Sequence, residues 1–286
     1  MQNYRRLFES WELKNFTIRS RICVPPLVIY NWGNGTGRVS EKSLKHYEAL
    51  TRGGAGLVIQ EATSVCPEGR LTKTMLGIWE DGQIEGLKRL AEVFHKADMP
   101  AILQLSHAGI LADGRENQVA PSEYRCFGNG EERVARELTE EELRVLEQRF
   151  IDGAERAYKA GYDGIELHAS HGYLLSELLN SRLNQRADAY NAKDRLFFKN
   201  IMRGIRAVTS QKFIIGARLG AFEPGIEEGI EIARWFEQEG ADFIDSFIGC
   251  DWEMDMIKPE GYPFHASIYG AKRVKESVSL PVFAVY

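Results

Sequence analysis

Two histidines and a tyrosine at the end of a short apolar run are the residues of this chain best suited to chemistry. The run from Gly164 to His168 has the composition of a strand buried on both faces, and His171 and Tyr173 lie in the turn that follows. Two neutral imidazoles can each donate an N–H to an oxygen that gains negative charge, and a nearby phenol can donate a proton. The spacing therefore predicts a site that polarises and protonates a carbonyl-bearing substrate.

Two other interpretations of this pair of histidines stay open from the residues alone. Either histidine by itself could be a structural residue at a strand end. The spacing His168-x-x-His171 could also begin a metal site, as in a metal-dependent hydrolase or lyase. Catalytic zinc usually takes three protein ligands, and no carboxylate or cysteine is grouped with this pair, so we expect no metal.

The composition is that of an ordinary globular protein. The 286 residues are 44% hydrophobic and 27% charged, and the formal net charge of −5 predicts neither a nucleic-acid partner nor a membrane partner. Four cysteines, Cys23, Cys66, Cys126 and Cys250, lack Cys-x-x-Cys spacing and are expected to be reduced thiols. No secretory signal or apolar run of about 20 residues is present, so we expect one cytoplasmic domain spanning residues 1–286.

Strand-like and helix-like segments alternate along the chain. Apolar runs predict seven strands, at 21–25, 56–60, 101–105, 164–168, 213–219, 242–246 and 282–286. Amphipathic patterns with capping signals predict helices at 40–52, 81–97, 139–160, 195–208, 227–239 and 266–278. This order indicates parallel strands joined by right-handed crossovers, as in an α/β (β/α)₈ TIM barrel, with the site at the carboxyl ends of the strands. A closed barrel has eight strands, so we expect a barrel that lacks its last βα unit.

The motifs along the chain resemble those of the old yellow enzyme family, which are FMN-dependent NAD(P)H oxidoreductases that reduce activated alkenes. The segment 165–175 resembles the family signature around its two histidines and tyrosine. Further similar segments are 7–9 with 15–26 (a short N-terminal β cap and first strand), 69–70, 77–79, 104–109 and 184–190. The resemblance covers nearly the whole chain and implies one FMN-binding TIM-barrel domain.

The resemblance implies a role for each of several residues. His168 and His171 would donate hydrogen bonds to the substrate oxygen, and Tyr173 would protonate the α-carbon after hydride reaches the β-carbon from reduced flavin. Tyr30 corresponds to an aromatic residue on the substrate side. The residues implied to bind FMN are Pro25, Pro26, Leu27, Ala62, Gln104 and Arg218. For Gln104 and Arg218, a strand-end salt bridge is the alternative explanation. The implied reductant is NADPH or NADH, the implied partner is a small α,β-unsaturated carbonyl or nitro compound, and a homo-oligomer is left open.

Several departures from the family pattern bear on function. Val28 replaces a cysteine that is common near the flavin, Pro25 replaces a serine or alanine, and Ile110 replaces an arginine. In such barrels, phosphate binds the loops after the seventh and eighth strands, so we expect weaker FMN binding by the chain as given. The alternative function is a catalytically inactive truncated barrel that acts, if at all, as a partner-binding remnant.

Overall fold

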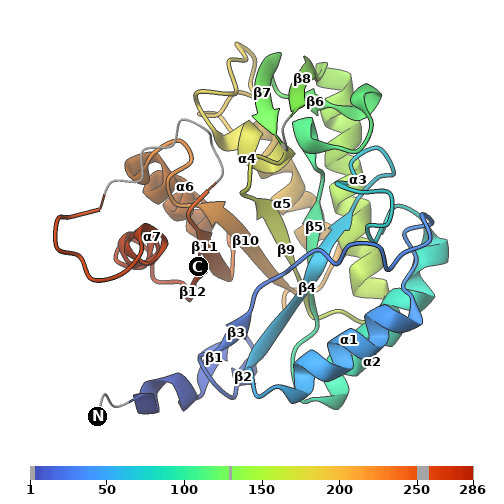
Figure 1. Ribbon diagram of the computed structural model, residues 1–286, viewed down its shortest axis with the longest axis vertical. Helices are drawn as coiled ribbons and strands as arrows, with labels where there is room; N and C mark the ends of the chain where they lie inside the picture. The colour runs from blue at the N-terminus through green and yellow to red at the C-terminus, as the bar shows by residue number, and fades with distance from the viewer. Residues whose placement is uncertain (1–3, 129–130, 250–257, 286) are drawn as a thin grey trace.

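The central element of the fold is a seven-stranded sheet that curves into a nearly closed α/β barrel (Figure 1). The computed structural model describes residues 4–128, 131–249 and 258–285. Every neighbouring pair of strands in this sheet is parallel. In sheet order the strands are β12 (Val282–Ala284), β11 (Phe243–Phe247), β10 (Ile214–Gly220), β9 (Gly164–Ala169), β5 (Ile102–Ser106), β4 (Leu57–Ser64) and β3 (Cys23–Val24). The predicted fold class and the seven predicted strands are confirmed, although Tyr286 lies outside the described residues.

Six helices lie where the amphipathic patterns predicted them. They are α1 (Glu41–Arg52), α2 (Ile84–Lys96), α3 (Glu140–Lys159), α5 (Leu196–Val208), α6 (Ile226–Gln238) and α7 (Ala266–Lys275). The predicted capping box of α3 is present, since the Thr139 side chain accepts from the Glu142 amide and the Glu142 carboxylate accepts from the Thr139 amide. The predicted start of α2 at Asp81 is instead a 3₁₀ turn, Asp81–Gln83.

A short hairpin covers the amino-terminal end of the barrel. Strands β1 (Trp11–Leu13) and β2 (Phe16–Ile18) are antiparallel and follow the 3₁₀ turn Tyr4–Phe8. Leu13 and Ile18 are buried against the first residues of the barrel strands, among them Leu57 and Phe243. The hairpin thus forms the predicted N-terminal cap and closes the end of the barrel away from the histidines.

A three-stranded unit that the sequence analysis did not predict lies between β5 and α3. Two short 3₁₀ turns, η3 (Gly109–Leu111) and η4 (Arg115–Asn117), lead into β6 (Val119–Ala120), β7 (Tyr124–Gly128) and β8 (Glu131–Glu137). Strand β8 pairs with β6 in parallel and with β7 antiparallel. In Figure 1 this β6–β8 sheet lies beside the short helix α4 (Leu174–Leu179), above the carboxyl ends of the barrel strands.

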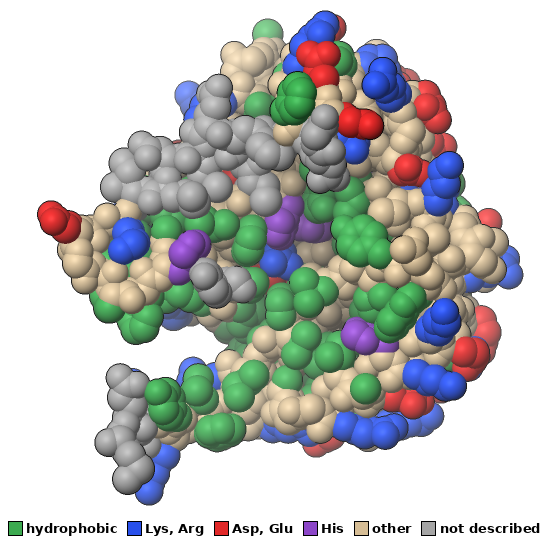
Figure 2. Space-filling model, in the orientation of Figure 1, with side chains coloured by type: hydrophobic (Ala, Val, Ile, Leu, Met, Phe, Trp, Pro, Cys, Tyr) green, Lys and Arg blue, Asp and Glu red, His purple; other side chains and the backbone are tan. Residues whose placement is uncertain are grey.

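The two ends of the barrel sheet, β3 and β12, are not paired with each other in the described part of the chain. Between them lies a cavity of about 730 Å³, whose lining includes Cys23, Pro25, Asp245 and Phe283. The cavity therefore reaches the inner face of the barrel from the side, and Figure 2 shows the molecule hollowed on this side, between the N-terminal segment and α7.

The cysteines and the helices bear on two further predictions. Cys23 and Cys66 are free thiols, as predicted, and Cys250 lies outside the described residues. Within the described ranges, no helix combines the length and the apolarity that crossing a bilayer requires.

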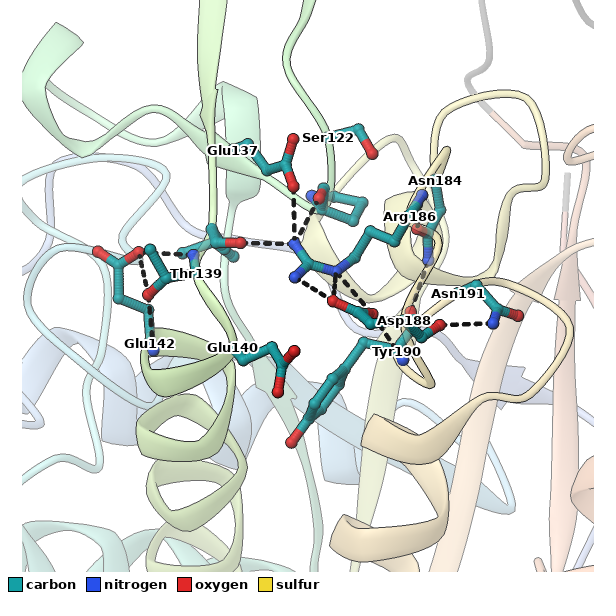
Figure 3. Close-up of polar contacts among 12 residues, drawn as sticks. Ser122, Glu137, Thr139, Glu140, Glu142, Asn184, Arg186, Asp188, Tyr190 and Asn191 are labelled. Carbon is teal, nitrogen blue, oxygen red and sulfur yellow. Dashed lines mark hydrogen bonds and ion pairs between the residues drawn. The ribbon is translucent and has the colours of Figure 1, made fainter.

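One buried arginine joins the loop after α4 to the β6–β8 sheet (Figure 3). The guanidinium of Arg186 donates to the carboxylate of Asp188 and to the carbonyl oxygens of Pro121 (3.0 Å) and Leu138 (2.5 Å). Asp188 in turn accepts from the Tyr190 amide at 2.9 Å. A planar fork of donors is needed to reach all these acceptors at once.

We predict that Arg186→Lys lowers the free energy of unfolding by about 1–3 kcal/mol, because a single ammonium cannot satisfy the carboxylate and two carbonyls together. Urea unfolding followed by circular dichroism measures the change. The matched control is Arg144→Lys, whose side chain is 57% exposed and whose ion pairs should contribute little. Equal stability of both variants would contradict the bridging role of Arg186.

Candidate active site

Neighbouring strands bring the predicted polar residues together at the carboxyl end of the barrel. Gln104 of β5 lies opposite Glu166 of β9, and His168 of β9 lies opposite Arg218 of β10. Arg218 also lies opposite Asp245 of β11. All five side chains are buried, so the parallel register sets a layer of polar groups inside the barrel.

The two histidines and the tyrosine form one cluster of rings. The ring centroids of His168 and His171 are 5.0 Å apart, and those of His168 and Tyr173 are 4.8 Å apart, both with edge-to-face geometry. The centroids of His171 and Tyr173 are 6.1 Å apart. The three groups that the sequence placed in one small volume are therefore in contact range of each other.

A tight turn between β9 and α4 makes this cluster. His171 has a φ of 67° and Gly172 a φ of 65°, so two successive residues adopt the left-handed conformation. This conformation costs a non-glycine residue of the order of 1 kcal/mol and persists where the surroundings hold it. The turn reverses the chain, so Tyr173, the residue before α4, returns to His168.

Phe247, the last residue of β11, holds both His171 and Arg218. Its ring stacks on His171 with centroids 4.3 Å apart, and the Arg218 guanidinium carbon lies 5.3 Å from its ring centroid. The sequence analysis missed Phe247 because it ended this strand one residue earlier. Its aromatic side chain at the carboxyl end of a barrel strand was the available signal.

Arg218 is the cation of the polar layer and faces two carboxyl groups. It donates to the Pro26 carbonyl at 3.2 Å, and its Nε lies 3.5 Å from an Asp245 carboxylate oxygen. Glu166 accepts a 2.7 Å hydrogen bond from Gln104. Burial raises the pKa of Asp245 to about 6, and burial and the Asp245 charge raise the pKa of Glu166 well above its usual value. The salt bridge considered for Arg218 is therefore present, but it is buried within the layer.

The segment after β3 is tied to the same layer. Pro26 is buried and its carbonyl accepts from Arg218, and Ala62 of β4 lies opposite Gln104 in the register with β5. Glu61 accepts from the Ile29 amide at 2.9 Å, which anchors the segment to β4. Leu27 and Tyr30 are 66% and 56% exposed. The structure thus brings Pro26 and Ala62 to the polar layer and leaves Leu27 and Tyr30 at the surface.

Several buried nitrogen atoms in this region make no hydrogen bond to the described residues, although one of them, Nε of Arg218, is ion-paired with Asp245. They are Nδ1 of His168, Nδ1 of His171 and Nε of Arg218. Burial, with a smaller contribution from the Arg218 cation, lowers the pKa of His171 to about 3, and burial likewise lowers the pKa of His168. Neutral imidazoles and an arginine suit an oxygen-rich, electron-accepting ligand. No group of three or more potential metal ligands occurs in the part of the chain that the structure describes.

Comparison with known proteins identifies the family of this chain. The model of the NADH:flavin oxidoreductase / NADH oxidase family matches residues 6–285. The chain belongs to this family. An NADPH dehydrogenase of Bacillus cytotoxicus is 32% identical, over 98% of this chain and 81% of the relative. The predicted resemblance to the old yellow enzymes is thereby confirmed at the level of the family.

Solved structures of such proteins share the fold. An old yellow enzyme homologue from Zymomonas mobilis superposes with a TM-score of 0.79 and 24% identity, over 98% of this chain and 82% of that one. A 2-naphthoyl-CoA reductase superposes with a TM-score of 0.86 and 22% identity, over 98% of this chain. The chain spans only 46% of the length of that reductase. Both likenesses support the TIM-barrel architecture.

Two carboxyl residues of the polar layer were also missed. Glu166 lies two residues before His168, and the two-residue repeat of a strand puts both side chains on the same face. Asp245 is the charged residue of the buried strand β11, and a charged residue in a buried strand is itself a signal. Both could have been found by listing, along each strand, every second residue, because these side chains point into the barrel.

We predict that His171 stays neutral from about pH 7 to about pH 5, because burial disfavours the imidazolium. Two-dimensional nitrogen NMR of labelled protein reports the protonation state of each ring. The His171→Asn variant assigns the signal. A His171 ring that charges within this interval would contradict the neutral donor.

Proposed function

We propose that this family member is an FMN-dependent NAD(P)H oxidoreductase that reduces activated C=C bonds, with Tyr173 as the proton donor. The observation that carries the proposal is the contact of His168, His171 and Tyr173 beside the strand ends that hold Arg218. In this proposal His168 and His171 bind the substrate oxygen, and Tyr30 lies on the substrate side.

The residues of the polar layer fit an FMN ring. Its pyrimidine edge carries two carbonyl oxygens, and Arg218 offers a buried guanidinium whose Nε makes no hydrogen bond and lies 3.5 Å from the Asp245 carboxylate. Gln104 and Ala62 lie side by side on neighbouring strands, and Pro25, Pro26 and Leu27 run along the segment that Arg218 holds. These six residues are proposed to bind the cofactor. Bound FMN supplies the hydride chemistry, and the protein supplies position and charge.

The histidines act on the substrate oxygen. As the β-carbon of an enone or nitroalkene accepts hydride, this oxygen gains negative charge, and donors aimed at it stabilise the transition state more than the ground state. Such a donor can contribute about 3 kcal/mol. Because both imidazoles are neutral, each can donate an N–H without adding a positive charge next to Arg218.

Tyr173 completes the reaction by giving a proton to the α-carbon. Its ring lies edge to face against His168, with centroids 4.8 Å apart, so its side chain lies beside one of the proposed oxygen-binding donors. Proton donation by a positioned side chain contributes about 10²–10⁴-fold to a rate.

The relatives indicate the reductant and the breadth of substrates. The relative from Bacillus cytotoxicus is an NADPH dehydrogenase, so we propose NADPH, with NADH as the alternative. The 2-naphthoyl-CoA reductase was solved with 2-naphthoyl-CoA, a conjugated carbonyl compound. A conjugated carbonyl or nitro compound is accordingly the substrate class of this proposal.

Purified protein should bind FMN, and we predict that Arg218→Lys weakens this binding about 10–100-fold. The reason is the loss of one or more charge-assisted hydrogen bonds, at about 1.5–3 kcal/mol each. Titration followed by quenching of flavin fluorescence gives both dissociation constants.

Arg206→Lys is the matched control for this titration. Arg206 donates to the Gly240 carbonyl and pairs with Asp242 at the opposite end of the barrel. It should change stability and leave FMN affinity unaltered. Equal affinity of the wild type and Arg218→Lys would remove Arg218 from the cofactor site.

For the FMN-loaded protein, Tyr173→Phe should slow reduction of 2-cyclohexenone by about 10²-fold or more while reduction of the flavin by NADPH stays nearly unchanged, since only alkene reduction needs the phenol proton. Stopped-flow absorbance measures the two half-reactions separately. Equal losses in both would contradict the proton-donor role. Protein that binds no FMN and reduces no alkene would favour the inactive remnant instead.

A further inference from the structure

One buried carboxyl group joins the β6–β8 sheet to the helix that follows Tyr173. Glu177 of α4 is fully buried, and its Oε1 accepts the Tyr124 hydroxyl at 2.7 Å and the Ile110 amide at 3.2 Å. Tyr124 belongs to β7 and Ile110 to η3, so three segments that are distant in the sequence meet at this carboxyl. Figure 1 shows α4 beside the β6–β8 sheet at the same end of the barrel.

The same residue is bonded to Tyr173 through the backbone. The Glu177 amide donates to the Tyr173 carbonyl at 2.9 Å, and the Ser176 hydroxyl donates to the same carbonyl at 3.0 Å. Helix α4 has six residues, fewer than an isolated helix needs for stability, so tertiary contacts hold it in place. Its packing partners include β6 and η3. A shift of α4 would therefore displace the residue at its amino terminus.

The surroundings of Glu177 favour its neutral form. Its Oε2 has no hydrogen-bond partner among the described residues, and a Cβ added at Gly109 would lie 2.6 Å from that oxygen. The ionisable groups that face it are Tyr124 from β7 and Glu223 from the loop after β10. Burial above all, and the Glu223 charge, raise the pKa of Glu177 to about 8. Deprotonation would create a charge in a tightly packed, buried place.

We propose that Glu177 is a positioning residue for Tyr173, which holds α4 against η3 and the β6–β8 sheet through its bonds to Ile110 and Tyr124. The proposal rests on the proposed function of Tyr173 as proton donor. In this proposal Glu177 acts through Tyr173 and touches neither the substrate nor the cofactor.

Two substitutions separate this role from simple packing. Glu177→Ala removes both hydrogen bonds, whereas Glu177→Gln keeps an acceptor oxygen of the same shape and cannot ionise. In FMN-loaded protein we expect Glu177→Ala to slow 2-cyclohexenone reduction at least about 10-fold and to leave flavin reduction by NADPH within about twofold. Glu177→Gln should restore most of the loss.

The pH profile gives a second readout. Wild-type alkene reduction should fall as the pH rises through about 8, where Glu177 ionises, and the profile of Glu177→Gln should lack this component. Equal slowing of both half-reactions in Glu177→Ala, or no rescue by Glu177→Gln, would overturn the proposal.

A measurement without flavin keeps this test independent of the proposed function. In protein labelled with ¹³C-tyrosine, the ring signals of Tyr173, assigned with Tyr173→Phe, should shift in Glu177→Ala and stay close to wild type in Glu177→Gln. Unshifted Tyr173 signals in Glu177→Ala would overturn the positioning role. Failure to bind FMN would instead count against the proposed function alone.

Discussion

The structure of the site depends on one buried cation, the guanidinium of Arg218. Two carboxyl groups, Glu166 and Asp245, lie on the strands at either side of it, and no second cation of comparable burial neutralises them within the described residues. Burying an unpaired charge is costly. With one guanidinium and two carboxyl groups, the layer becomes electrically neutral when Glu166 is protonated, and the raised pKa of Glu166 favours that form. The same guanidinium donates to the Pro26 carbonyl and lies against the Phe247 ring. Arg218 therefore also helps to position the segment after β3 and the end of β11 at the carboxyl end of the barrel.

The histidines are neutral for a related reason. His168 is buried and His171 is half-buried near Arg218, and loss of solvent together with that positive charge disfavours a second cation. A site with neutral donors and one fixed cation favours ligands that carry or acquire negative charge. The strained turn at His171 and Gly172 is held by the stacking of His171 on Phe247, so local backbone strain is offset by contacts that come from a different strand.

The fold was largely predictable because most barrel strands contain short apolar runs and several helices carry clear caps, as at Thr139. The β6–β8 sheet was not, because β8 is Glu-Glu-Arg-Val-Ala-Arg-Glu and has one buried side chain, so its pattern indicates neither a strand nor a core face. Helix α4 is too short for a period and is stabilised by contacts from other segments. In the site, His168, His171 and Tyr173 could be found from their types and spacing. Glu177 could not, because its partners come from segments that only the folded chain brings near, and Phe247 was missed because the predicted strand ended one residue too early.

The β6–β8 sheet is made of one uninterrupted stretch of chain between β5 and α3, and the barrel strands on either side pair without it. Insertions, deletions or exchanges confined to this stretch would therefore change the surface above the carboxyl ends of the barrel strands, which we call the entrance to the site. The register of β5 with β9 would stay the same. The entrance and the barrel are in this sense separate structural modules. Sequence changes among family members can alter the entrance without changing the pairing of the barrel strands.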